Sequence, residues 1–290
     1  MFQSIVDDIK GQFTYGNMIA RIILVNLFFL IVINLVKVFT PPGSGFFNEF
    51  IHYIGLPAST YSWMTRPWTL VTHMFSHIGL WHFAWNMIFL YWFGRIVGDL
   101  IGDRKILPLY LIGGLAGGFA FILWAQLSGF GGYAIGASGA VNCFLLAAAI
   151  LAPEYNLRLL FIGDVKLKYV AVTLILIDLL FSSAGNPGGT AAHLGGAFMG
   201  GLYVYLLQRG RDLTLPLQNL FDGSHSRRRK SKAKMEVVYH KKRPERVQSQ
   251  EPREQDVQDR IDQILDKINL TGYDSLTKEE KEFLYQASKK

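Results

Sequence analysis

Two residues are of types that together can catalyse the cleavage of acyl bonds. Each lies near one end of a separate apolar stretch. Ser138 lies in a Gly-Ala-Ser-Gly-Ala run at 136–140, and His193 lies in an Ala-His-Leu-Gly-Gly run at 192–196. A serine hydroxyl is a weak nucleophile until a base accepts its proton, and histidine is the side chain that titrates near neutral pH. The two residues therefore predict nucleophilic catalysis, with Ser138 as the nucleophile and His193 as the general base.

A second pair of polar residues has the chemistry to stabilise the reaction intermediate. His82 and Asn86 are four residues apart, so on a helix they share one face. Attack on an amide creates an oxyanion, which needs preorganised donors such as a backbone N–H, an Asn amide or a His ring. We expect the Ser138 N–H, His82 and Asn86 to supply these donors.

The composition predicts that a membrane holds these residues. Half of the 290 residues are hydrophobic and only 18% are charged, which is too apolar for a typical soluble domain. A spanning helix needs about 20 mostly apolar residues. Six stretches come close enough to that length to count: 19–39, 80–101, 106–127, 134–152, 169–181 with its flanks, and 190–207. The fifth is the shortest and contains Asp178. The expected fold is an all-α membrane protein with a bundle of six transmembrane helices.

The distribution of basic residues predicts the orientation of the bundle. Lys and Arg lie in the N-terminal segment and in the connections after the second and fourth stretches, whereas the other connections hold only Arg66. Basic connections stay on the cytoplasmic side. Both termini are then cytoplasmic, and the four candidate site residues all fall near the outer ends of their helices. We expect a multi-pass protein of the bacterial plasma membrane whose active site lies towards the outer face.

Each of these features also has a plainer explanation. A transmembrane serine commonly bonds its own helix backbone, and a lone transmembrane histidine commonly bonds a neighbouring helix. The agreement in depth favours a catalytic site, because polar groups in spanning segments are costly. Gly196 and Gly200 lie on the helical face of His193, and small residues at this spacing let two helices approach closely. We therefore expect stretches 134–152 and 190–207 to touch where Ser138 meets His193.

The chain divides into three parts by composition. Residues 1–208 form the membrane body, 209–255 are a basic segment predicted to be a disordered linker, and 256–290 are predicted to form a small cytoplasmic pair of helices. The pair of helices at 256–290 is predicted from apolar residues at helical spacing and from a Thr277-x-x-Glu280 capping box. The linker's basic cluster either attracts anionic lipid or is a solvated cytoplasmic anchor. Nucleic-acid binding is not expected, because no aromatic or groove-reading element accompanies the charges.

The arrangement of motifs resembles a known family. The motifs are H-x-x-x-x-H-x-x-x-N at 77–86, G-A-S-G at 136–139 and H-x-x-G-x-x-x-G at 193–200. Their order, on the second, fourth and sixth of six helices, resembles that of the rhomboid intramembrane serine proteases. The resemblance covers about residues 60–207. It implies a Ser138–His193 dyad and cleavage of membrane-anchored proteins at or near a transmembrane segment, without a metal or nucleotide cofactor.

Three positions depart from the family pattern. Gly98, with Asp99 adjacent, stands where an acidic residue is common twelve positions after the oxyanion Asn. Thr69 follows Trp68 where many rhomboids have Arg, and Asn142 stands where bacterial members often have an aromatic residue that stacks on the catalytic histidine. The stack is then replaced by a hydrogen bond or by another side chain.

Other protease classes fit the sequence less well. A zinc protease needs His-Glu-x-x-His, and His73 and His77 enclose no Glu. An intramembrane aspartyl protease needs two membrane aspartates, and Asp178 is the only clear one. We expect Asp178 to face the bundle interior and bond a neighbour, and the catalytic pair to lack a carboxylate. The main alternative function is that of a catalytically inactive rhomboid-like protein that binds transmembrane helices; the presence of both Ser138 and His193 favours the enzyme.

Overall fold

Helices make up most of the computed structural model, which describes residues 17–159, 162–182, 185–222 and 254–288. The helices of the membrane body are α2 (Met18–Phe39), α3 (Phe46–Ile54), α4 (Thr60–Thr65), α5 (Thr69–Thr72), α6 (Leu80–Ile101), α7 (Ile106–Ser128), α8 (Ser138–Leu151), α9 (Leu167–Ile177), α11 (Pro187–Gln208) and α12 (Leu215–Asp222). Short 3-10 turns cover His73–Phe75 and Asp103–Lys105, and a π turn covers Asp178–Ser182. A separate unit contains α13 (Glu254–Thr271), a 3-10 turn at Tyr273–Ser275, and α14 (Lys278–Ala287).

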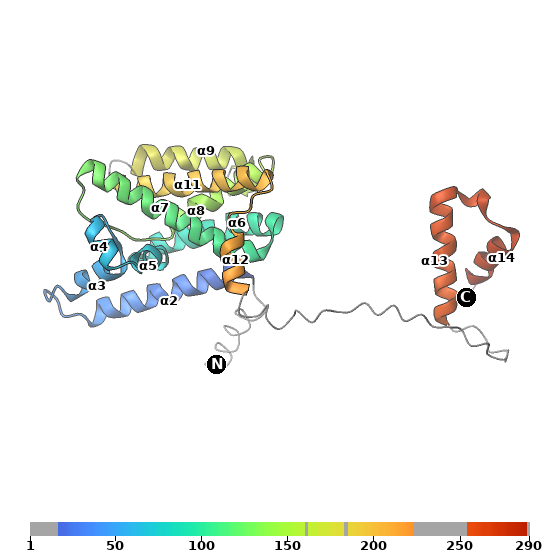
Figure 1. Ribbon diagram of the computed structural model, residues 1–290, viewed down its shortest axis with the longest axis horizontal. Coiled ribbons are helices and arrows are strands. Elements are labelled where there is room, and N and C mark those ends of the chain that lie inside the picture. The colour runs from blue at the N-terminus through green and yellow to red at the C-terminus, as the bar shows by residue number, and fades with distance from the viewer. Residues whose placement is uncertain (1–16, 160–161, 183–184, 223–253, 289–290) are drawn as a thin grey trace. The chain divides into compact units, whose positions relative to one another are not determined.

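The short helix α8 is the centre of the membrane body. It packs against α6, α7, α9 and α11, and Figure 1 shows it inside the bundle, beside α7 and α11. Most of its side chains are apolar and many are small, and Ala140, Cys143, Ala147 and Ala148 are fully buried. A helix that is apolar on all faces is stable only when it is surrounded. The helix that begins at Ser138 is therefore the one most enclosed by its neighbours.

Glycines allow α8 and α11 to approach to backbone contact. A Cβ at Gly196 would lie 1.9 Å from the Gly139 carbonyl oxygen, and one at Gly200 would lie 2.1 Å from the Cys143 carbonyl oxygen. No side chain fits in either place. The predicted contact between these two helices is confirmed.

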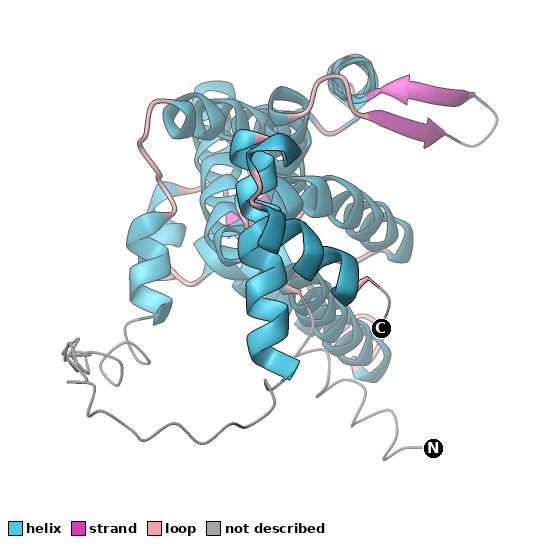
Figure 2. Ribbon diagram, turned by 90° about the vertical axis from the view of Figure 1, so that its right-hand side faces the viewer, coloured by secondary structure: helices cyan, strands magenta, loops and turns pink. Residues whose placement is uncertain are grey.

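Helices form at all six predicted stretches, with two differences at their ends. The expected start at residue 134 is wrong: Tyr133–Ala134 form strand β2, which pairs antiparallel with β1 (Leu56–Pro57), and α8 begins four residues later. The fifth helix, α9, ends at Ile177 and continues as the π turn. Between α8 and α9, β3 (Asn156–Leu159) and β4 (Gly163–Lys166) form a hairpin that projects from the bundle in Figure 2.

Not all of these helices are long and apolar enough to cross a bilayer. By length and composition, α2 and the helix over Asp103–Ser128 qualify among the described residues. The 14 residues of α8 extend about 21 Å, which is less than the ~30 Å hydrocarbon layer. The number of six crossings stays a prediction.

The first part of the predicted linker is ordered. Asp212 forms an ion pair with Lys105 at 2.9 Å, Thr214 is fully buried, and α12 follows. This contact joins positions about a hundred residues apart in the chain, so the local composition of 209–222 does not reveal it. Residues 223–253, which hold the basic cluster, lie outside the described residues.

The C-terminal unit has the helical pair expected from its sequence. The Thr277 Oγ accepts a hydrogen bond from the Glu280 N–H, and the Glu280 carboxylate accepts one from the Thr277 N–H, so the capping box is confirmed. Lys267 donates to both oxygens of Glu280 at 2.9 Å, which ties α13 to α14. Ile264 of α13 and Leu276, in the connection before α14, are both buried.

Candidate active site

The loop before α8 places Ser138 at the start of that helix. Gly136 has φ +132°, and a Cβ there would lie 2.6 Å from the His82 ring, so only glycine fits. The Gly136 N–H donates to the His73 carbonyl at 2.9 Å, and the Ala137 N–H donates to His77 Nε2 at 3.3 Å. As the first residue of α8, Ser138 has a backbone N–H that the helix itself does not use.

The neutral ring of His77 fixes this loop. Burial, reinforced by the neighbouring His82 ring, lowers the pKa of His77 to about 3, so Nε2 can accept the Ala137 N–H. Burial also lowers the pKa of His73 to about 4, and its Nδ1 donates to the Thr69 carbonyl at 2.8 Å. Both histidines hold backbone in place, so the pair that a zinc protease would need has a structural role.

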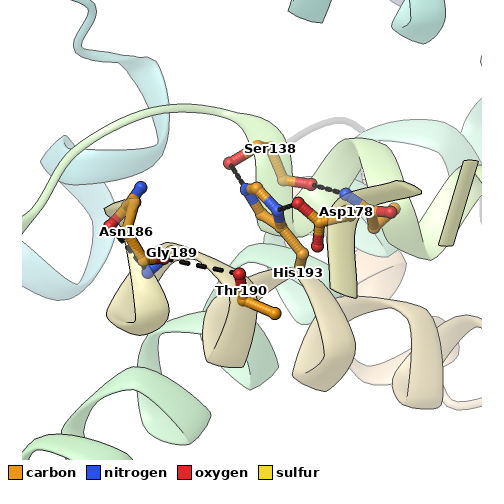
Figure 3. Close-up of polar contacts among 7 residues, drawn as sticks. Ser138, Asp178, Asn186, Gly189, Thr190 and His193 are labelled. Atoms are coloured by element: carbon orange, nitrogen blue, oxygen red, sulfur yellow. Dashed lines mark hydrogen bonds and ion pairs between the residues drawn. The ribbon is translucent and has the colours of Figure 1, made fainter. Parts of the chain in front are cut away.

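The start of α11 positions His193. Pro187 is the first helical residue, and the Asn186 side chain accepts a hydrogen bond from the Gly189 N–H at 3.0 Å. A capping Asn followed by Pro is a strong helix-start signal. His193 follows about two turns later and faces α8 (Figure 3). Its Nε2 lies 2.7 Å from Ser138 Oγ, so the two predicted residues form a hydrogen-bonded pair.

A carboxylate lies on the other side of the histidine ring. Asp178 Oδ1 is 2.8 Å from His193 Nδ1, as drawn in Figure 3. The prediction that Asp178 bonds a neighbour agrees with this contact, whereas the prediction that the pair lacks a carboxylate is wrong. The signal was present in the sequence: Asp178 lies about one turn from the outer end of stretch 169–181, at the same expected depth as Ser138.

The two predicted oxyanion donors line the site from α6. His82, Asn86, Ser138 and His193 all line a cavity of about 260 Å³, and His82, Ser138 and His193 also line a second cavity of about 430 Å³. Asn86 is buried, and its Nδ2 donates one hydrogen to the His82 carbonyl at 2.7 Å. The structure therefore brings all four predicted residues to one place, where two cavities meet.

Two of the three departures from the family pattern, Asn142 and Thr69, have local roles. Asn142 Nδ2 donates to the Ser138 carbonyl at 3.0 Å. Thr69 is buried, and its hydroxyl donates to the Arg66 carbonyl at 2.7 Å. In the described part of the chain, no group of three or more His, Cys, Asp or Glu residues could hold a metal ion.

Comparisons with known proteins found two family models that match parts of this chain. A family model described as the Rhomboid domain matches residues 64–210, and a family of unknown function (DUF6576) matches residues 250–290. The RHOMBOID-like protein 12, mitochondrial, of Arabidopsis thaliana is 34% identical over 161 residues, which cover 50% of this chain and 48% of that relative.

Two further relatives share the same region. The human Presenilin-associated rhomboid-like protein, mitochondrial, is 31% identical over 45% of this chain and 35% of its own length. The Rhomboid protease GluP of Bacillus subtilis is 27% identical over 67% of this chain and 34% of its own length. The chain thus matches half or less of the length of each of these relatives.

Proposed function

Since the chain belongs to the rhomboid family of membrane proteins, we propose that it is a serine endopeptidase that cleaves transmembrane-anchored proteins at or near a membrane-spanning segment. The observation that carries this proposal is the 2.7 Å contact between Ser138 Oγ and His193 Nε2. A structural serine in a helix commonly bonds its own backbone, whereas this hydroxyl bonds a histidine on another helix. This contact also disfavours the inactive, helix-binding alternative.

The geometry supports a two-step acyl transfer. His193 Nε2 accepts the Ser138 hydroxyl proton while Oγ attacks the scissile carbonyl, and His193 then donates that proton to the leaving amine. Water, deprotonated by the same ring, hydrolyses the acyl-enzyme and restores Ser138. The oxyanion forms beside the Ser138 N–H, where the N-terminus of α8 adds a favourable dipole, and beside His82 and Asn86.

The membrane orientation is part of the proposal. Both termini are placed in the cytoplasm and the active site towards the outer face, because the basic connections lie on the opposite side from the site. The bacterial plasma membrane agrees with the Bacillus relative, whereas the mitochondrial names of several relatives favour a mitochondrial membrane. The expected partners are transmembrane substrates, and anionic lipid at the basic cluster of 223–253.

Cleavage of a single-span model substrate by the purified full chain tests the proposed function. The variant Asn86→Ala, measured in the same assay, tests the proposed oxyanion site. An oxyanion donor acts mainly in the transition state, so kcat should fall while KM changes little. In a soluble serine protease, removing one such donor lowers kcat by about 10²–10³-fold. The loss here should be smaller, about tenfold to 10²-fold, because Asn86 already donates to His82 and shares the site with it. Unchanged turnover by Asn86→Ala would remove this residue from the site.

A further inference from the structure

The contact between His193 and Asp178 extends the proposed pair. We propose that Asp178 is the positioning residue of a Ser138–His193–Asp178 triad, so that the chain uses three residues rather than a dyad. This inference rests on the proposed function, since a positioning carboxylate matters only if His193 acts as a base. It is carried by the arrangement of the three side chains, which come from three different elements: α8, α11 and the π turn after α9.

The hydrogen-bond geometry selects the reactive form of the ring. An ionised carboxylate can only accept hydrogen bonds, so at 2.8 Å from Asp178 Oδ1 the His193 Nδ1 must carry a hydrogen. A neutral imidazole has one N–H, and Nε2 is then left with a lone pair. That lone pair faces Ser138 Oγ at 2.7 Å. The carboxylate thus holds His193 in the tautomer that can accept the serine proton.

The backbone at Asp178 brings the carboxylate to the ring. Regular α-helix ends at Ile177, and Asp178 begins a π turn that contacts α11. Such turns occur frequently at functional sites, because the wider turn redirects a side chain. The side chains of His193 and Asp178 are only 19% and 17% exposed, so water screens their contact less than it would on the surface.

The carboxylate also stabilises the charge that forms during the reaction. When Ser138 gives its proton to Nε2, the ring becomes an imidazolium between Asp178 and the oxyanion. Asp178 stays ionised throughout and attracts this positive charge; the proton passes from Ser138 to His193 and then to the leaving amine. Removing the carboxylate therefore raises the barrier without removing any atom that touches the substrate.

The test is to replace the carboxylate by an amide of the same size in the full chain. In Asp178→Asn, the side-chain NH₂ can donate to Nδ1 and favour the wrong tautomer, while a link between the π turn and α11 is kept. We expect kcat to fall by at least about 10²-fold, since the equivalent change in a soluble triad costs about 10⁴. KM and the unfolding temperature should stay close to the wild-type values, and fluorophosphonate labelling of Ser138 should slow in parallel.

Two further variants make the result specific. Asp178→Glu keeps the carboxylate and should recover part of the lost kcat. Asp99→Asn removes an exposed carboxylate from α6 and should behave as wild type. If Asp178→Asn does not fold, the smaller Asp178→Ser takes its place.

The outcomes separate this inference from the proposed function. If the turnover of Asp178→Asn were within about threefold of that of Asp99→Asn, the triad would be overturned and the Ser138–His193 pair would stand. A threefold difference in rate is smaller than the tenfold difference that about 1.4 kcal/mol of activation free energy produces. A lowered unfolding temperature with unchanged kcat would show that Asp178 is only a structural tie. A folded wild-type chain that neither cleaves nor labels would overturn the proposed function, and the triad with it.

Discussion

Ser138→Ala and His193→Ala should each reduce cleavage of a transmembrane substrate to background while leaving the bundle folded. Ser138 supplies the attacking oxygen and His193 the base 2.7 Å away, so either change removes the covalent pathway. In a soluble serine protease, removing the nucleophile or the base costs about 10⁶ in kcat, and removing both costs little more. The double variant should therefore be no worse than either single one. Substrate cleavage by the purified variants, with circular dichroism to check folding, measures this.

A matched control is available in the same bundle. Ser128 is an exposed serine at the end of α7, and Ser128→Ala should retain wild-type turnover. Turnover by Ser138→Ala at the level of Ser128→Ala would contradict the assignment of the nucleophile.

The second large effect is expected at Gly196, which touches no substrate. A Cβ at this position would lie 1.9 Å from the Gly139 carbonyl oxygen, and this backbone atom cannot rotate away. In Gly196→Ala, α8 and α11 must therefore separate by about 1 Å, and a misplacement of that size can cost about 10² in rate. Overpacking of this kind also costs about 1–3 kcal/mol of stability. We expect turnover to fall by more than about 10²-fold and the unfolding temperature to drop.

Gly201→Ala is the matched control, five residues further along the same helix. Its Cβ would lie 3.3 Å from Leu146 Cδ2 and 3.5 Å from Ile150 Cδ1, which are the ends of flexible side chains. This variant should be close to wild type in both turnover and unfolding temperature. If Gly196→Ala were as active and as stable as Gly201→Ala, the close approach of α8 and α11 would not be what positions Ser138 against His193.

The main features of the candidate site could be predicted because they are local. The Gly-Ala-Ser-Gly run, the His82 and Asn86 pair and the His193 run each place a polar group at a fixed depth in its own helix. Depth is set by the length of each apolar stretch and by the basic connections, which a sequence displays directly. The glycines at 196 and 200 then identify the helix face that carries the close contact.

The features that escaped prediction depend on contacts between distant segments. The start of α8 at Ser138 follows from the pairing of Ala134 with Leu56, a strand contact between segments far apart in the chain. The depth of Asp178 could be read from the sequence, but its contact with His193 depends on the π turn after α9, for which the sequence gives no clear pattern. The order of residues 209–222 depends on the ion pair between Asp212 and Lys105.

The most direct test of the central claim is fluorophosphonate labelling of the purified full chain, because this reagent bonds only to an activated serine. We predict that wild-type protein is labelled, that mass spectrometry places the label on Ser138, and that Ser138→Ala and His193→Ala remain unlabelled. A folded wild-type chain without label, or a Ser138→Ala variant labelled as strongly as wild type, would contradict the account that His193 activates Ser138 for catalysis.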